Sequence, residues 1–258
     1  MSVSGKITVI TGGTSGIGAA AVRLFAQNGA KVVFVGTNAD KGKTVMSALH
    51  NDGLDGNVRF FRADVSKETD VKALAAFVRN EFGGCDVLFN NAGMHFQGKL
   101  LDTPPEMFDR VISVDLRGVY LCCYYLLPQM LEKQRGCIVN MSSVSGICAD
   151  YCMAAYNAAK GAVTNLTRAI AIDYAEQGIR VNAVCPGAVM TDMLDKTFRT
   201  IPGSEEANRK AYPTHTFATP EEVAEVVLFL AENKADFLNG ANIPIDGGIT
   251  AHTGQPRY

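Results

Sequence analysis

The chain has 258 residues, 47% of them hydrophobic and 19% charged, and a net charge of −2. This composition excludes intrinsic disorder, and the length suits one α/β domain with a large core. No Lys/Arg block stands out, and the longest apolar runs fall well short of the ~20 residues that span a bilayer. We therefore expect a single domain over residues 1–258, with neither nucleic acid nor a membrane as a partner.

The N-terminal segment and the cysteines indicate the cellular compartment. MSVSGKITVITGG lacks an apolar region followed by a small-residue cleavage site, and it passes directly into an expected strand. The seven cysteines are odd in number and form no CxxC pair, which favours core residues in a reducing compartment over disulfides or metal ligands. These features predict a cytoplasmic protein without a metal site.

Short apolar runs alternate with helical patterns along the chain. Strands are expected at 7–11, 31–36, 57–64, 86–93, 137–143, 180–187 and 241–248. Helices are expected at 16–28, 40–50, 69–82, 105–133 and 221–232, and another helix carries Tyr156 and extends to about 177. This alternation predicts a doubly wound Rossmann fold, in which helices cover both faces of a seven-stranded parallel sheet. The glycine-rich turn after the first strand favours this open sheet over a closed barrel.

That glycine-rich turn, TGGTSGIG at 11–18, separates the first strand from the first helix. Gly12, Gly16 and Gly18 allow a tight turn, a close approach of phosphate oxygens to backbone N–H groups, and close packing of helix on strand. A second segment, NNAG at 90–93, ends the fourth strand, where a glycine lets a cofactor approach the backbone. The structural alternatives are a flexible glycine turn and a turn whose backbone groups are satisfied by asparagine side chains.

Tyr156 and Lys160 stand four residues apart in an alanine-rich helical pattern, so they share one face of that helix. An ammonium group fixed beside a phenol favours the phenolate, and so lowers the pKa of the tyrosine toward working pH. Tyr156 can then move a proton, while the hydroxyl of Ser143 hydrogen-bonds the same substrate oxygen. The spacing by itself also occurs on ordinary surface helices.

The glycine turn, NNAG, a serine thirteen residues before YNAAK, and the PG of VCPGAVMTDM follow one another within residues 6–248. In this combination the chain resembles the short-chain dehydrogenase/reductase family. The resemblance implies an oxidoreductase that uses NAD or NADP, acts on a small-molecule alcohol or ketone, and forms a homotetramer or homodimer. It implies that Tyr156 is the general acid/base, that Ser143 orients the substrate carbonyl, and that Lys160 lowers the pKa of Tyr156 and holds the nicotinamide ribose.

The resemblance also assigns the binding residues. Cofactor contacts are expected from Gly12, Thr14, Ser15, Gly16, Ile17, Gly18, Thr37, Asp64, Val65, Asn91, Ala92, Gly93, Tyr156, Lys160, Pro186, Gly187, Val189 and Thr191. Substrate contacts are expected from His95, Ser145, Tyr151, Met153 and Met193. A variable substrate loop is expected at about 188–219, where Pro202, Gly203 and Pro213 interrupt the regular alternation.

One position departs from the family pattern. Relatives with a four-residue catalytic set usually carry an asparagine in a VNLxG motif on the long helix, whereas this chain reads VDLRG with Asp115. A carboxylate cannot donate as an amide does, although it can accept a hydrogen bond. Our hypothesis is that Asp115 keeps a relay role and belongs to the catalytic set.

The end of the second strand bears on cofactor choice. NAD-dependent enzymes commonly carry an acidic residue there for the ribose 2′-OH, whereas NADP-dependent enzymes carry a basic residue for the phosphate. This chain has Gly36, Thr37 and Asn38. Because these residues supply no charge to neutralise a phosphate dianion, the sequence favours NAD.

The apolar residues near the expected nicotinamide position favour a hydrophobic or cyclic secondary alcohol or ketone, such as a hydroxysteroid or a bile acid. Two alternatives stay open. One is a ketoreductase resembling 3-oxoacyl-acyl-carrier-protein reductase, for which Arg199, Arg209 and Lys210 give only a sparse basic surface. The other is a catalytically silent dinucleotide-binding sensor or scaffold, which Asp115 alone favours.

Overall fold

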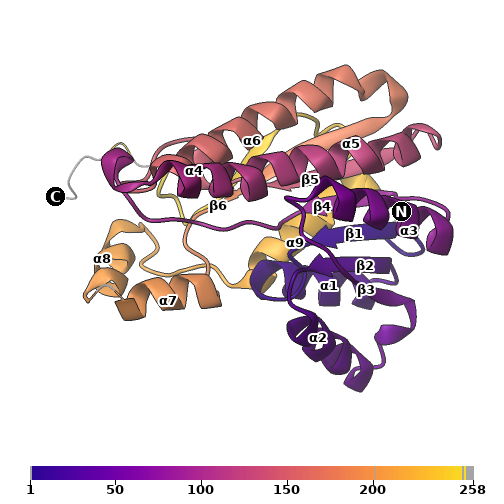
Figure 1. Cartoon of the computed structure of the whole chain (residues 1–258), viewed down its shortest axis with the longest axis horizontal. Helices are drawn as coiled ribbons and strands as arrows, with labels where there is room; N and C mark the ends of the chain where they lie inside the picture. Colours follow the sequence, from indigo (N-terminus) through magenta and orange to yellow (C-terminus); the bar gives the residue numbers. More distant parts are fainter. Residues whose placement is uncertain (1, 201, 252, 254–258) are drawn as a thin grey trace.

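Seven parallel strands form the central sheet of the computed structural model, which describes residues 2–200, 202–251 and 253 (Figure 1). The strands are β1 (Ile7–Thr11), β2 (Lys31–Gly36), β3 (Val58–Arg62), β4 (Val87–Asn90), β5 (Gly136–Met141), β6 (Ile179–Pro186) and β7 (Asn242–Ile245). Their order, β3-β2-β1-β4-β5-β6-β7, confirms the predicted doubly wound sheet. The order changes direction between β1 and β4, and open α/β sheets bind ligands beyond the carboxyl ends of the strands at such a point.

Two separate cores lie on the two faces of the sheet. On one face α3 (Glu68–Phe82), α5 (Gly118–Leu131) and α6 (Ala154–Asp173) pack against the strands. On the other face α1 (Gly16–Gln27), α2 (Ala39–Asn51) and α9 (Pro220–Ala231) do the same. Strands covered on both sides bury every residue, as all five positions of β1 show, which explains their continuous apolar runs.

The long apolar helix expected at 105–133 is divided into three parts. α4 (Pro105–Ile112) and α5 are joined by a π-helical turn at Ser113–Arg117. The whole stretch, Pro105–Leu131, is the one helix of the described chain that could cross a bilayer by length and composition. It serves instead as a packed helix of this fold, because half of its most apolar window is buried and it contacts α3 and α6.

The segment expected to be a substrate loop contains two short helices, α7 (Asp192–Thr200) and α8 (Ser204–Ala211), drawn in orange at one side of Figure 1. A short parallel bridge closes its base, where the N–H of Met190 donates to the carbonyl of Ala218 at 2.9 Å. Pro202 and Gly203 separate the two helices, and neither residue lies inside one. Pro202 and Gly203, which indicated a loop in the sequence, therefore lie at the boundary between two helices.

Candidate active site

The predicted site residues gather at the carboxyl edge of the sheet. The glycine turn follows β1, Thr37 follows β2, Asp64 and Val65 follow β3, Asn91, Ala92, Gly93 and His95 follow β4, Ser143 and Ser145 follow β5, and Gly187, Val189 and Thr191 follow β6, whose last residue is Pro186. Tyr156 and Lys160 come from the first turns of α6, and Asp115 comes from the π-helical turn. The fold thus brings residues from most of the chain to one edge.

Two glycines of the first turn are required by close approach. Gly12 has a φ of +66°, and a Cβ on it would lie 2.8 Å from the Cα of Ala92. A Cβ on Gly18 would lie 2.2 Å from the carbonyl oxygen of Gly12. Any side chain at either position would therefore push the turn away from β4 or from α1.

The start of α1 supplies unpartnered backbone donors. Its first intrahelical hydrogen bond runs from the N–H of Ala19 to the carbonyl of Ser15 at 3.1 Å, which leaves the N–H groups of residues 16–18 without helical acceptors. Thr191 lies over this turn, because a Cβ on Gly16 would meet its methyl carbon at 3.1 Å. Such a helix start fits the pyrophosphate of a dinucleotide, and the side chains of Thr14, Ser15 and Ile17 border it.

The NNAG segment stabilises the glycine turn through side chains. Asn91 donates through its amide to the carbonyls of Thr11 (2.9 Å) and Gly12 (3.2 Å). The hydroxyl of Thr11 in turn accepts from the N–H groups of Asn91 and Ala92, each at 3.0 Å. The side-chain amide of Asn91 is therefore used to stabilise the turn. The predicted contact of Asn91 with the ribose would have to come from its backbone.

Lys160 and Asp115 form a buried ion pair beneath Tyr156. Lys160 Nζ lies 3.2 Å from Asp115 Oδ2, and both side chains are almost fully buried. The ammonium group also donates to the carbonyl of Met141 at 3.0 Å, and lies 5.4 Å from the centre of the Tyr156 ring. The other carboxylate oxygen of Asp115 accepts from the N–H of Met94 at 2.8 Å. An ammonium group has three donors, so the hydrogen bond to Met141 and the ion pair with Asp115 leave at least one of them for a ligand.

Burial dominates the electrostatics of this group. It raises the pKa of Tyr156, and Lys160 opposes that shift while Asp115 adds to it. The expected net lowering of the tyrosine pKa is therefore wrong for this structure, because desolvation and the carboxylate outweigh the ammonium group. Burial alone would lower the pKa of Lys160, but Asp115 and Tyr156 outweigh it and keep the lysine charged. Burial raises the pKa of Asp115 against the opposing charge of Lys160.

Ser143 stands at the start of a short 3-10 turn, Val144–Gly146, and its hydroxyl is held by that turn. Its Oγ accepts from the N–H of Ser145 at 3.1 Å and donates to the Ser145 hydroxyl at 3.1 Å. Ser145 in turn donates to the carboxylate of Asp150. Asp150 was not predicted from the sequence, because nothing in its spacing connects it with Ser143.

The expected ribose end of the site contains one unforeseen cation. Thr37 is exposed, and Asn38 uses its side chain to cap α2 by accepting from the N–H groups of Asp40 and Lys41, each at 3.0 Å. Arg62 ends β3 beside Gly36 and donates through Nε to the carbonyl of Thr37 at 3.0 Å. The pairing of β2 with β3 brings the charge of Arg62 to the ribose end of the site. The sequence of residues 36–38 alone could not reveal this charge.

The predicted substrate residues surround the edge unevenly. Met153 is half-buried, and its bridge to Gly98 joins the segment after β4 to the start of α6, while Met193 on α7 is largely exposed. Burial lowers the pKa of His95, and the charge of Asp115 opposes this shift while that of Lys196 adds to it. Tyr151 is 97% exposed, so it forms no wall in this structure.

Tyr212 is a site residue that sequence reasoning missed. Its hydroxyl accepts from the N–H of Ala188 at 2.6 Å, and a Cβ on Gly187 would lie 2.7 Å from that oxygen. The ring therefore fixes the segment that follows β6. It reaches this position from the end of α8, 24 residues further along the chain.

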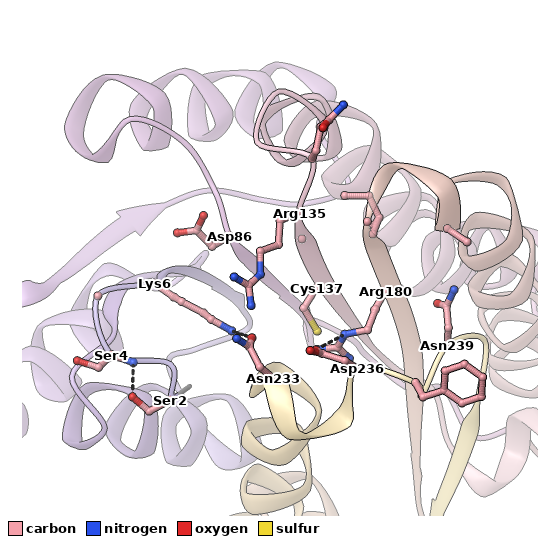
Figure 2. A pocket seen from close by; sticks show the side chains of 17 residues that line it. Ser2, Ser4, Lys6, Asp86, Arg135, Cys137, Arg180, Asn233, Asp236 and Asn239 are labelled. Carbon is pink, nitrogen blue, oxygen red and sulfur yellow. Dashed lines mark hydrogen bonds and ion pairs between the residues drawn. The ribbon is translucent and has the colours of Figure 1, made fainter.

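A cavity of about 1220 Å³ lies at the opposite, amino edge of the sheet (Figure 2). Two of its cations, Lys6 and Arg180, are used within the fold. Lys6 donates to the carbonyl of Ala231 at 2.7 Å, and Arg180 donates to those of Leu230 and Glu232 at 2.9 and 3.3 Å. Cations at a helix C-terminus satisfy free carbonyls, so this cavity marks the end of α9.

The carboxyl edge thus combines a dinucleotide-binding turn with a tyrosine, a lysine and a serine suited to proton transfer at a carbinol oxygen. These features define an oxidoreductase of the α/β dinucleotide-binding class. A family model described as enoyl-(acyl carrier protein) reductase matches residues 12–250. The chain belongs to the short-chain dehydrogenase/reductase family, as its motifs predicted.

Relatives of this chain are dehydrogenases of CH–OH groups. It is 42% identical over 257 residues to meso-2,3-butanediol dehydrogenase of Serratia marcescens, covering 100% of this chain and 99% of that protein. It is 38% identical to 2,5-dichloro-2,5-cyclohexadiene-1,4-diol dehydrogenase of Sphingobium indicum, covering 96% and 98%. The solved structure titled "ElxO with NADP Bound" has a TM-score of 0.90 at 32% identity, covering 96% of this chain and 100% of that one. The chain is accordingly an NAD- or NADP-dependent alcohol/ketone oxidoreductase. The comparisons therefore do not support the alternative of a catalytically silent dinucleotide-binding sensor or scaffold.

Proposed function

We propose that this enzyme oxidises a secondary alcohol to a ketone, reversibly, with Tyr156 as the general acid/base. The observation that carries the proposal is the ion-paired Lys160 one helical turn from Tyr156, with its ammonium group 5.4 Å from the ring. Lys160 has at least one donor left beside its hydrogen bond to Met141 and its ion pair with Asp115, which suits a ribose hydroxyl. Gly12, the start of α1 and the segment after β6 would hold the remainder of the dinucleotide.

The bound nicotinamide supplies or accepts the hydride. In oxidation, Tyr156 takes the hydroxyl proton of the substrate, and Ser143 hydrogen-bonds the same oxygen as it becomes a carbonyl. In reduction, Tyr156 returns the proton. Lys160 stabilises the phenolate by its charge, and Asp115 fixes the ammonium group in position.

Substitution of Tyr156 by phenylalanine tests this assignment. We expect Tyr156→Phe to lose roughly a thousandfold or more in kcat, since the acid/base oxygen is gone, while it still binds the cofactor. Tyr151→Phe is the matched control, because that tyrosine lies five residues away and is 97% exposed. Reduced nicotinamide absorbance reports turnover, and a Tyr156→Phe enzyme as active as the control would refute the proposal.

We infer that NAD(H) is the preferred cofactor. Thr37 and Asn38 carry no charge, and the nearby Lys41 lies 3.7 Å from Asp192, which leaves Arg62 to face a 2′-phosphate. One exposed guanidinium group gives partial compensation for a phosphate dianion. We therefore expect NADP(H) to be accepted with a lower kcat/KM, and a large preference for NADPH would overturn this inference.

We propose a substrate with an apolar or cyclic body. Met190 and Met193 are exposed beside the site, and the ring of Phe198 on α7 lies 5.4 Å from that of Phe217. The names of the similar dehydrogenases describe a short diol and a cyclic diol, both compact secondary alcohols. A substrate panel should therefore contain short and cyclic secondary alcohols together with a hydroxysteroid and a bile acid, each tested with NAD⁺ and NADP⁺.

We also propose a homodimer or homotetramer in a reducing cytoplasmic compartment. Tyr120 and Tyr124 on α5 are 49% and 58% exposed, and the centres of their tilted rings lie 5.8 Å apart. Ile172 on α6, a helix on the same face of the sheet, is also exposed. Exposed aromatic side chains of this kind are enriched at interfaces between copies. All seven cysteines are free, which supports the compartment.

A further inference from the structure

A hydrogen-bonded chain of three side chains leads from Ser143 to an exposed carboxylate. Ser143 donates to Ser145 at 3.1 Å, and Ser145 donates to Asp150. The backbone of Asp150 is held by Asn157, which accepts from its N–H at 3.2 Å and donates to its carbonyl at 2.9 Å. Because Asn157 follows Tyr156 on α6, the carboxylate is tied to the same helix as the proton-transfer residue.

Counting the hydrogen-bond donors shows that these three linked side chains use up the proton of Ser143. An ionised carboxylate only accepts, so Ser145 must give Asp150 its single proton. Ser145 can then only accept from Ser143, and the single proton of Ser143 is used. With one lone pair of Ser143 taken by the N–H of Ser145, the hydroxyl presents an acceptor and no donor to a substrate.

The proposed function needs Ser143 to donate to the reacting oxygen. Ser143 must then turn away from Ser145, which loses its hydrogen bond from Ser143. A second hydroxyl on the substrate, on the carbon next to the reacting carbon, can replace Ser143 as the donor to Ser145. The two oxygens of a gauche vicinal diol lie at about hydrogen-bonding distance, about 2.8 Å, close to the 3.1 Å between the two serine oxygens.

The charge of Asp150 acts on this site. Burial is the main cause of the raised pKa of both Tyr156 and Tyr212, and the charge of Asp150 adds to the shift of each. Tyr212 fixes the segment after β6, so Asp150 lies within electrostatic reach of both sides of the site. Its side chain is accessible, whereas Ser145 is buried.

We propose that Asp150, acting through Ser145, makes the site recognise a hydroxyl group on the carbon next to the reacting carbon, so that the enzyme selects vicinal diols and α-hydroxyketones over simple alcohols and ketones. This inference rests on the proposed function. The second hydroxyl donates to Ser145 in place of Ser143, because Asp150 holds the proton of Ser145 and keeps Ser145 an acceptor, and this releases the proton of Ser143 for the reacting oxygen. Asp150 is thereby a specificity-determining residue, and Ser145 connects it with Ser143.

The test compares 2,3-butanediol with 2-butanol, which differ by one hydroxyl, in the full-length enzyme with NAD⁺. We expect kcat/KM for the diol to exceed that for 2-butanol by roughly ten- to hundredfold, the cost of leaving one buried hydrogen-bonding group without its partner. Asp150→Asn keeps the shape of the side chain and should bring this ratio down by roughly tenfold. Ser145→Ala should also lower the ratio of kcat/KM for the diol to that for 2-butanol, but by raising kcat/KM for 2-butanol. The reason is that the proton of Ser143 is free when Ser145 has no hydroxyl.

Glu176→Gln is the control, since it removes one carboxylate from an exposed position in the turn before β6. Equal kcat/KM for the two alcohols in the wild type would overturn the inference. An equal loss for both alcohols in Asp150→Asn would also overturn it, because it would show that Asp150 only holds its loop. Turnover of other secondary alcohols but not of 2,3-butanediol would overturn this inference while leaving the proposed function standing, whereas failure of the whole alcohol panel would overturn both.

Discussion

Asp115 changes what Lys160 can do for Tyr156. A lysine without a partner would place a full positive charge beside the phenol, but here a carboxylate 3.2 Å from the ammonium group offsets that charge. The pair is buried, so little water screens it. The usual asparagine would leave the charge of the lysine uncompensated. Asp115 therefore keeps Tyr156 protonated to a higher pH.

Asp115→Asn should move the pH profile of alcohol oxidation to lower pH. Oxidation needs the phenolate, so kcat/KM rises as pH passes the pKa of Tyr156. Removing the carboxylate removes a cause of the raised pKa of Tyr156, and we expect the rising limb to shift down by about one pH unit. Asp109→Asn is the control, because Asp109 lies six residues earlier on α4 and is exposed. A profile identical to that of the control would show that the carboxylate has no special electrostatic role.

Gly18 and Gly161 give a paired test of the glycine turn. A Cβ at Gly18 would lie 2.2 Å from the Gly12 carbonyl, whereas a Cβ at Gly161 on α6 meets nothing within 4 Å. We expect Gly18→Ala to raise the cofactor Kd by roughly tenfold or more, since the phosphate turn must shift. Gly161→Ala should leave Kd unchanged and stabilise the fold by about 0.5–1 kcal/mol, because alanine favours a helix. Titration calorimetry and thermal unfolding measure the two effects.

At the scale of elements, the adjacent ends of β2 and β3 decide cofactor choice together. Arg62→Ala should lower kcat/KM for NADPH by roughly tenfold and leave that for NADH nearly unchanged, since the guanidinium group serves the 2′-phosphate. Arg59→Ala is the matched control, because Arg59 lies in the same strand three residues earlier. Equal losses with both cofactors would show that Arg62 only supports Thr37 through its backbone carbonyl.

Most elements follow directly from the sequence, whereas contacts between distant elements do not. The seven strands were predicted because buried parallel strands give continuous apolar runs. The helices α7 and α8 were missed, because exposed polar helices separated by proline and glycine resemble a loop. Arg62 and Tyr212 were missed because strand pairing and a chain reversal bring them to the site. The tyrosine pKa was misjudged because a local spacing gives no measure of burial.

At the scale of the whole molecule, the exposed tyrosines of α5 predict the oligomeric state. Tyr124→Glu should reduce the molecular mass measured by light scattering at micromolar concentration, since a charge in an aromatic interface opposes association. Tyr151→Glu places the same charge at another exposed tyrosine and should leave the mass unchanged. A monomeric wild type would contradict the proposed assembly, and an unchanged mass in Tyr124→Glu would place the interface elsewhere.

The π-helical turn at Ser113–Arg117 amounts to one residue more than a regular helix would hold there. Each residue of an α-helix advances about 100° around the axis, so this insertion sets the phase between α4 and α5. It lets Asp115 face Lys160 while the residues of α5 still turn their apolar side to the sheet. Deleting one residue here would give a straighter and more regular helix, but that helix could satisfy either the ion pair or the core and not both. The π-helical turn therefore allows one helical segment both to pack against the sheet and to supply Asp115 to the site.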